Sequence, residues 1–310
     1  MELPPPRRTL LGRLAAWVEQ AHALRAAIES ARGRSAALDA TLETVERDSH
    51  LGGGILAGAL SYRLFVFALP LAFFLVSGLG LVASALGVGA HRLVNSVGFA
   101  GIVAKQVEVA SKGSSSWWAA LTSFLVLVYA TRVLLRAIAI IHSLTWERSA
   151  ASVKVTPRAL GIFAAALVGQ MLLVAGVGSV GHQTPVGGLV ALAASVLPLA
   201  GLWLVVGLQV PHSNARWTDL IPGSLFYAIG FTFIVIFNIL ILGEMLKSKS
   251  NTYGALGIAA GLLLAFFFVG RLIVGAAVLN ATLYERRTRS RDARRGAASE
   301  DRPAEEVLSP

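Results

Sequence analysis

Four arginines lie inside long apolar stretches of the 310-residue sequence: Arg63, Arg132, Arg136 and Arg271. No Asp or Glu occurs well within any of these stretches. A guanidinium in membrane hydrocarbon costs about 2.5 kcal/mol or more, so such residues are expected to face water, the carbonyls of a broken helix or an anion. The planar guanidinium also matches the geometry of phosphate and carboxylate, which predicts anion binding at these positions.

The depths of these arginines along their helices are similar. Counted from the more basic end of each stretch, Arg63 is about 17 Å deep and Arg271 about 18 Å deep. By the same count Arg132 is about 14 Å deep and Arg136 about 8 Å deep. Arg132 and Arg136 are four residues apart and therefore share a helix face. We expect three helices to present guanidinium groups to one basic cavity in the middle of the membrane.

Two interpretations of the arginines remain open at the level of sequence. In the functional one, the three deeper arginines bind an anion and Arg136 guides it inward, while Tyr62 and Asn238 supply further hydrogen bonds. In the structural one, each guanidinium snorkels to the interface or bonds carbonyls of a neighbouring helix. The structural interpretation suits Arg136 best, because Arg136 is nearest the interface.

The composition indicates the elements that must position these residues. Hydrophobic residues make up 55% of the chain and charged residues 14%, whereas soluble domains average about 25% charged residues. This excludes a soluble enzyme and a disordered chain. Six apolar stretches are each long enough to cross a ~30 Å hydrocarbon core: residues 52–83, 117–141, 157–180, 189–210, 220–243 and 253–283. The predicted fold is an all-α polytopic membrane protein with six transmembrane helices over residues 51–284.

Three further segments complete the predicted organisation. Residues 1–50 have apolar positions at helical spacing and predict amphipathic cytoplasmic or interfacial helices. Residues 86–116 predict an amphipathic segment on the outer surface. Residues 285–310 are charged and without periodicity, which predicts a disordered tail. Most of the 27 Lys and Arg residues fall on the side of the termini, so the positive-inside rule predicts that both termini are cytoplasmic.

Two glycine patterns accompany the spans. The pairs Gly54/Gly58 and Gly257/Gly261 predict places where helices approach closely. Residues 176–181 match a dinucleotide-binding fingerprint, but they end a span and follow no strand, so we set this match aside.

The chain contains no sequence pattern for catalysis or metal binding. It has no cysteine, its six histidines are scattered, and no paired carboxylates lie in a span. We predict no enzyme activity, no catalytic residue, no metal and no cofactor. The net charge of +10 first suggests nucleic acid, but its largest block is the four arginines within the spans. We therefore predict membrane lipids, and not nucleic acid, as partners.

Short motifs occur in a fixed order along the chain: Ala59-Leu-Ser-Tyr62 with Leu69-Pro70-Leu71, then Ile221-Pro222-Gly223, Tyr253-Gly254-Ala-Leu256-Gly257 and Leu279-Asn280-Ala281. This order resembles the YihY/BrkB family of bacterial inner-membrane proteins over about residues 50–290. The chain departs from the family pattern at Val278, where an acidic residue is usual, and at Leu69, where Phe is usual. The resemblance implies a six-helix fold in the bacterial plasma (inner) membrane and a link to virulence and envelope lipid export. The ribonuclease label once given to the family has no catalytic set to support it here.

These observations lead to two hypotheses of function. The first is a transporter or flippase-like permease for an anionic substrate, either a lipid or lipid-linked headgroup or a small anion. The alternative is a non-transporting membrane scaffold or envelope assembly factor, in which the arginines hold helices together. The sequence predicts neither the substrate nor the oligomeric state.

Overall fold

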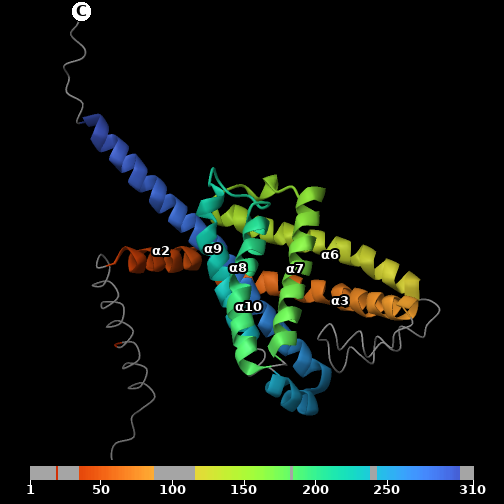
Figure 1. Cartoon of the computed structure of the whole chain (residues 1–310). Coiled ribbons are helices and arrows are strands. Elements are labelled where there is room, and N and C mark those ends of the chain that lie inside the picture. Colours follow the sequence, from red (N-terminus) through yellow and green to blue (C-terminus); the bar gives the residue numbers. More distant parts are fainter. Residues whose placement is uncertain (1–18, 20–34, 87–115, 182–183, 238–242, 301–310) are drawn as a thin grey trace, which may run out of the picture. The chain divides into compact units, whose positions relative to one another are not determined.

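The computed structural model describes residue 19 and residues 35–86, 116–181, 184–237 and 243–300. All regular elements in these ranges are helical, and Figure 1 shows them in chain order: α2 (Ala36–His50), α3 (Gly53–Leu86), α6 (Ser116–Thr145), η1 (Ala150–Ser152), α7 (Pro157–Gly181), α8 (Pro185–Gly207), η2 (Trp217–Asp219), α9 (Ile221–Phe237) and α10 (Gly243–Glu300). The chain divides into two units, residues 1–47 and 48–310. Every contact described below lies within the second unit.

Five helices are long and apolar enough to cross a membrane: Gly53–Gly78, Ala120–Thr145, Pro157–Gly178, Val186–Gly207 and Ala259–Gly296. These correspond to five of the six predicted spans, and they confirm an all-helical fold of the membrane class. The remaining one corresponds to α9, an apolar helix of 17 residues. Residues 238–242 of that predicted span lie outside the described ranges, so a count of six and the side on which the termini lie stay predictions.

Polar side chains within the spans form hydrogen bonds inside their own helices. The hydroxyl of Ser61 donates to the Gly58 carbonyl at 2.8 Å, and that of Thr131 donates to the Leu127 carbonyl at 2.6 Å. Thr232 bonds the Ala228 carbonyl in the same way, at 2.9 Å. Such bonds satisfy a hydroxyl where no water is present, so these residues can lie in an apolar helix.

The helices of the second unit pack in two groups that meet at α10. Helix α3 lies beside α6 and α10, whereas α7, α8 and α9 pack in succession and α9 contacts α10. In Figure 1, α3 and α6 run across α7 and α8. The largest fully buried apolar side chains come from α3, α6, α8 and α10: Leu60, Leu134, Leu135, Ile138, Val206, Val274 and Val278.

Close helix contact occurs at a glycine that the motif analysis did not identify. A Cβ at Gly270 of α10 would lie 2.7 Å from the Ala57 carbonyl of α3. By contrast, a Cβ at Gly54 or Gly58 would meet no atom of the described residues within 4 Å. The prediction that this GxxxG pair brings helices together is therefore wrong, and the surroundings of Gly257 lie outside the description.

Helix α10 extends well past the last predicted span, through a segment expected to be disordered. It is 58 residues long and ends at Glu300, so the prediction of a disordered tail is wrong for residues 285–300. The segment is rich in Arg, Ala and Glu, which are good helix formers. It also contains an i,i+4 ion pair, Glu285 to Arg289 at 3.4 Å, and such pairs stabilise exposed helices. Residues 301–310 are not described.

The two remaining predicted segments are described only in part. Helix α2 contains the expected apolar positions Leu38, Leu42 and Val45, while residues 1–34, apart from Glu19, are not described. The predicted outer segment at 86–116 also lies outside the described residues except at its two ends. After α2, Gly52 adopts a left-handed conformation with φ of 65°, which a glycine accepts without steric cost. This turn leads directly into α3 at Gly53.

Candidate functional site

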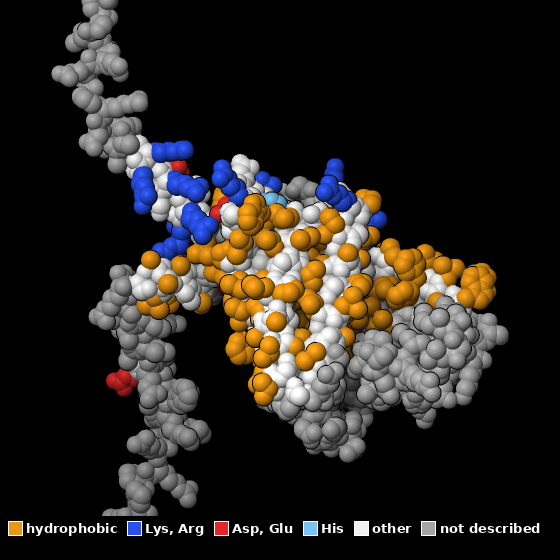
Figure 2. Space-filling model, in the orientation of Figure 1, with side chains coloured by type: hydrophobic (Ala, Val, Ile, Leu, Met, Phe, Trp, Pro, Cys, Tyr) orange, Lys and Arg blue, Asp and Glu red, His pale blue; other side chains and the backbone are white. Residues whose placement is uncertain are grey.

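Figure 2 shows how charge and apolar surface are divided on one face of the protein. Hydrophobic side chains cover the helices, while Lys and Arg gather over the loops at one end and along the last part of α10. We call this region the basic end. Its residues include Arg148, Lys154 and Arg158 in and after the α6–α7 loop, and Arg216 in the α8–α9 loop. The positive-inside rule predicts that the basic end is cytoplasmic.

Four of the predicted site residues lie on exposed faces of α3 and α6. Arg63, Arg132 and Arg136 are all exposed, and so is Tyr62, with 65% of its surface accessible. On α6 the two arginines continue a stripe with Tyr129, which is 70% accessible. Among the described residues, none pairs with these three guanidinium groups. The structure thus places them on an outer surface, and they do not line the cavity described below.

Arg63 nevertheless lies at the same level as the two arginines of α6. The rings of Phe74 on α3 and Phe124 on α6 are in contact, with centroids 5.8 Å apart, and Figure 1 shows the two helices running antiparallel. From this contact toward the basic end, Arg63 is about 16 Å along α3, at 1.5 Å per residue. Arg132 and Arg136 are about 12 Å and 18 Å along α6 by the same rule. Measured along the helices from the Phe74–Phe124 contact, Arg63 therefore lies between Arg132 and Arg136.

The fourth arginine has a carboxylate partner. Arg271 of α10 donates to both carboxylate oxygens of Asp48, at 3.2 Å and 2.8 Å. The arginine side chain is 37% exposed and the aspartate 17%. Asp48 also lies directly against Gly53, where a Cβ would collide with its carboxylate. The expectation that all four arginines lack a carboxylate is wrong at Arg271, because Asp48 comes from the residues just before the first span.

The last predicted site residue cannot be placed. Asn238 lies outside the described residues, so its proposed hydrogen bond to a substrate stays a prediction. Gln170, a polar residue in the middle of α7, is described and bonds across to α9, with its Nε2 3.3 Å from the Tyr227 hydroxyl. Trp203 of α8 stacks on Tyr227 with ring centroids 4.0 Å apart. This group joins three helices.

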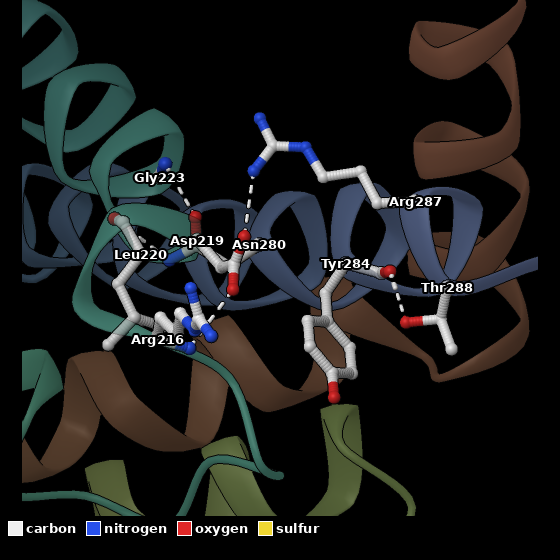
Figure 3. Close-up of polar contacts among 8 residues, drawn as sticks. All are labelled: Arg216, Asp219, Leu220, Gly223, Asn280, Tyr284, Arg287 and Thr288. Carbon is white, nitrogen blue, oxygen red and sulfur yellow. Dashed lines mark hydrogen bonds and ion pairs between the residues drawn. The ribbon is translucent and has the colours of Figure 1, made fainter. Parts of the chain in front are cut away.

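A polar junction attaches the start of α9 to α10 (Figure 3). The Asn280 side chain accepts from the Gly223 N–H at 2.7 Å and donates to the Leu220 carbonyl at 3.3 Å. Gly223 is required there, because a Cβ would collide with the Ala276 carbonyl and with Asn280. Asn280 therefore satisfies one of the backbone donors left open at a helix N-terminus. The motifs Ile221-Pro222-Gly223 and Leu279-Asn280-Ala281 therefore have a structural role, because their residues form this junction.

A second set of contacts lies beside this junction at the basic end (Figure 3). Asp219 accepts from the Arg287 guanidinium at 2.8 Å and from the backbone N–H of Arg216 at 3.0 Å. Tyr284, one turn before Thr288 on α10, packs against Trp146 with ring centroids 5.4 Å apart. The Asp219 contact connects the α8–α9 loop, and the Trp146 contact the end of α6, to the part of α10 that follows the predicted last span at residues 253–283.

One cavity opens at the basic end and has a volume of about 340 Å³. We call it the basic pocket. The α6–α7 loop contributes Arg148 and Lys154, and the α8–α9 loop contributes Gln209 and His212. The remaining lining residues are apolar, and none is acidic. The pocket can therefore hold a small anion between two loops.

The turn after α6 positions Arg148 at this pocket. Glu147 has a φ of 53°, and the N–H of Arg148 bonds the Ser143 carbonyl at 2.7 Å while that of Glu147 bonds the Leu144 carbonyl at 3.2 Å. This is the Schellman arrangement of a helix C-terminus. A glutamate in the left-handed region costs about 1–2 kcal/mol compared with glycine. The backbone thus turns sharply enough to direct the next residues over the end of α6.

The basic pocket was not identified from the sequence. Arg148 and Lys154 were interpreted only as part of the cytoplasmic charge bias, and Gln209 and His212 were not singled out. The two loops are separated by more than fifty residues, and only the packing of α6, α7 and α8 brings them together. One feature of the sequence could have indicated this pocket: neither residues 148–159 nor residues 207–215 contain Asp or Glu.

Comparison with known proteins gives one match. The family model for virulence factor BrkB matches residues 46–301, which is most of the chain. No curated protein and no solved structure matches the chain. The match covers all helices from α3 to α10 and agrees with the resemblance inferred from the four ordered motifs.

Proposed function

The chain belongs to the virulence factor BrkB family, and we propose that it moves an anionic lipid or lipid-linked headgroup across the bilayer along the exposed arginines of α3 and α6. The observation that supports this proposal is the outward position of Arg63, Arg132 and Arg136 at neighbouring heights inside two membrane-length helices. We call these three residues the arginine track.

The cost of these residues in a membrane argues for a bound anion. Each unpaired guanidinium in hydrocarbon costs about 2.5 kcal/mol or more. A lipid phosphate is the anion that reaches such a surface while its acyl chains stay in the bilayer, and a guanidinium binds it through two parallel hydrogen bonds. The phosphate thus offsets the cost of exposing the arginine.

The spacing of the track suits movement in steps. Arg132 and Arg136 are about 6 Å apart along the axis of α6, and Arg63 lies between them in height on the neighbouring helix. A headgroup can therefore leave one guanidinium as it contacts the next. Tyr62 and Tyr129 are exposed beside the arginines and supply further donors to a phosphate or an ester oxygen.

A second candidate function, a membrane scaffold, is favoured by one contact. Arg271 is paired with Asp48 and thereby attaches α10 to the turn before α3. Under the scaffold hypothesis, the arginine track would be covered by lipid or a partner without moving it. The two hypotheses differ in whether the protein alone changes the distribution of lipids.

The experiment is a lipid translocation assay with the purified full-length chain in liposomes. The liposomes contain fluorescent phosphatidylglycerol or fluorescent phosphatidylcholine. Labelled lipid that moves from the inner to the outer leaflet becomes accessible to an external quencher, so the loss of fluorescence measures translocation. We expect faster exposure of the anionic lipid than in protein-free liposomes. Arg132→Gln should slow it about tenfold, the loss of one charge-assisted contact. Arg63→Gln should act similarly.

The matched control is Arg291→Gln, which removes an exposed arginine of α10 far along the chain from the track. It should leave the rate unchanged. A wild-type rate equal to that of empty liposomes refutes translocation and favours the scaffold. Equal rates for Arg132→Gln and wild type refute the role of the track even if lipid moves.

A further inference from the structure

We propose that the basic pocket binds a phosphomonoester, either as free phosphate or a small phosphorylated compound, or as the terminal phosphate of a lipid headgroup. None of its residues belongs to the arginine track, and the proposal does not depend on lipid translocation. The pocket lies between two loops at the basic end, where Figure 2 shows Lys and Arg gathered.

The charge of the lining selects an anion. Arg148 and Lys154 come from one loop, and no Asp or Glu lines the pocket to neutralise them. Arg provides a planar pair of donors and Lys a mobile point charge, the combination that proteins use for phosphate. Gln209 adds an amide that donates to a phosphate or ester oxygen.

The start of α7 adds to this positive field. The helix begins at Pro157, and Ala159 in its first turn lines the pocket. Thr156 caps the helix, because its Oγ1 accepts from the Ala159 N–H at 3.2 Å. The positive end of the helix dipole is therefore close to the pocket, on the same side as the two cations.

Two imidazoles lie at or beneath the pocket. His212 lines it and donates from Nδ1 to the Val210 carbonyl at 2.8 Å, so Nε2 is the ring nitrogen that can accept from the hydroxyl of a monohydrogen phosphate. His142 is buried, with 6% of its surface accessible, and neither of its nitrogens has a hydrogen-bond partner among the described residues. His142 shares the α6 face of Leu135 and Ala139, which line the pocket. The buried imidazole therefore lies about one turn from the pocket wall.

The size of the pocket indicates more than a bare ion. A volume of about 340 Å³ falls at the lower end of the range for small-molecule sites. It leaves room for a phosphate together with the group to which it is esterified. The apolar residues of the lining, such as Val153 and Val210, can contact the carbon atoms of that group.

The test is a binding measurement with the full-length chain. Inorganic phosphate and glycerol 3-phosphate are titrated onto protein in detergent by isothermal calorimetry. In a second arm, protein in nanodiscs of phosphatidylcholine is compared with protein in nanodiscs containing phosphatidic acid, with thermal unfolding as the readout. Saturable binding of the soluble compounds identifies a free phosphomonoester. Stabilisation by phosphatidic acid alone identifies a lipid headgroup. Either result supports the pocket if the variants below respond.

The variants isolate the pocket from general charge. Arg148→Gln and Lys154→Gln should each weaken binding about tenfold, because each removes a charge-assisted contact, and Lys154→Arg should retain most of it. The matched control is Arg158→Gln, an exposed arginine beside the same loop that does not line the pocket. Both pocket residues are exposed on loops, so these variants should remain folded.

Three results would overturn the proposal. They are no binding in either arm, equal binding by the wild type and the Arg148→Gln/Lys154→Gln double variant, and equal weakening by Arg158→Gln. Arg132→Gln, on the arginine track, should leave phosphate binding unchanged. The experiments can therefore refute the proposal of lipid translocation without refuting that of phosphate binding, and the reverse.

Discussion

The ion pair between Arg271 and Asp48 decides whether one of the four intramembrane arginines is structural. We predict that the two residues stabilise the fold together and that neither contacts the substrate. The perturbation is a double-mutant cycle of Asp48→Asn, Arg271→Gln and the double variant. The two substitutions are close in size to the native residues, so they mainly remove charge.

The expected magnitudes follow from burial. Charge-assisted hydrogen bonds contribute about 1.5–3 kcal/mol when buried, and the 37% exposure of Arg271 reduces this through solvent screening. We expect a coupling energy of about 1–2 kcal/mol. Both single substitutions should destabilise the protein, because Arg271→Gln leaves a carboxylate that is only 17% exposed without its partner, and Asp48→Asn leaves an unpaired guanidinium on an apolar helix.

The assay is reversible or kinetic unfolding of the purified protein in one detergent, with the Glu285→Gln/Arg289→Gln cycle as a control. That control pair is an i,i+4 contact at 3.4 Å, in which the Arg289 side chain is 66% and the Glu285 side chain 33% exposed. It should couple by no more than about 0.5 kcal/mol. Additive effects of Asp48→Asn and Arg271→Gln would refute the structural interpretation. The structural interpretation would also be refuted if Asp48→Asn moved anionic lipid faster, or bound its headgroup more tightly, than the wild type. Such a result would show that Asp48 competes with an anion for Arg271.

Two further substitutions test how α10 is held. Asn280→Ala should destabilise by about 2–3 kcal/mol, because it leaves the buried Gly223 N–H without an acceptor and the Leu220 carbonyl without a donor; thermal unfolding measures this, and a loss below 0.5 kcal/mol would show that the junction contributes little. Gly270→Val should lower the yield of folded protein sharply, because its Cβ would lie 2.7 Å from the Ala57 carbonyl. Gly54→Val should express normally, because no atom of the described part of the chain lies within 4 Å of a Cβ there. Similar yields for both would contradict the close contact of α3 and α10.

The positions of the helices were predictable because membrane length and hydropathy constrain them strongly. A helix must satisfy its own backbone in hydrocarbon, so an apolar run of about twenty residues has few alternatives. The predicted start of the fifth span at residue 220 and the predicted end of the second span at residue 141 agree within a few residues with the start of α9 at Ile221 and the end of α6 at Thr145. The tail after Tyr284 differs from its predicted disorder for another reason. A lack of apolar periodicity predicts disorder, but Arg and Ala extend a helix without burying a face.

The partner of Arg271 was not predictable from span composition. Asp48 lies outside the first apolar stretch, and only the left-handed turn at Gly52 folds its carboxylate toward α10. A search limited to acids within spans therefore misses a counter-ion that precedes a span by a few residues. The long arginine side chain makes such a pairing possible, because it can reach beyond its own position on the helix.

The outward direction of the arginine track was not predictable either, and this follows from how membrane helices differ from soluble ones. In a soluble helix the polar face is the outer one, so periodicity identifies the side that faces the core. In α6 both faces are apolar, with buried Leu134 and Ile138 on one and exposed Leu125 and Tyr129 on the other. The four-residue spacing of Arg132 and Arg136 showed that they share a face, but not which face. Polar residues in spans usually turn inward, and the reverse arrangement here requires that the charge be met from outside the helix bundle. This is why a lipid headgroup, rather than an ion in a closed cavity, is the anion that the arginine track fits.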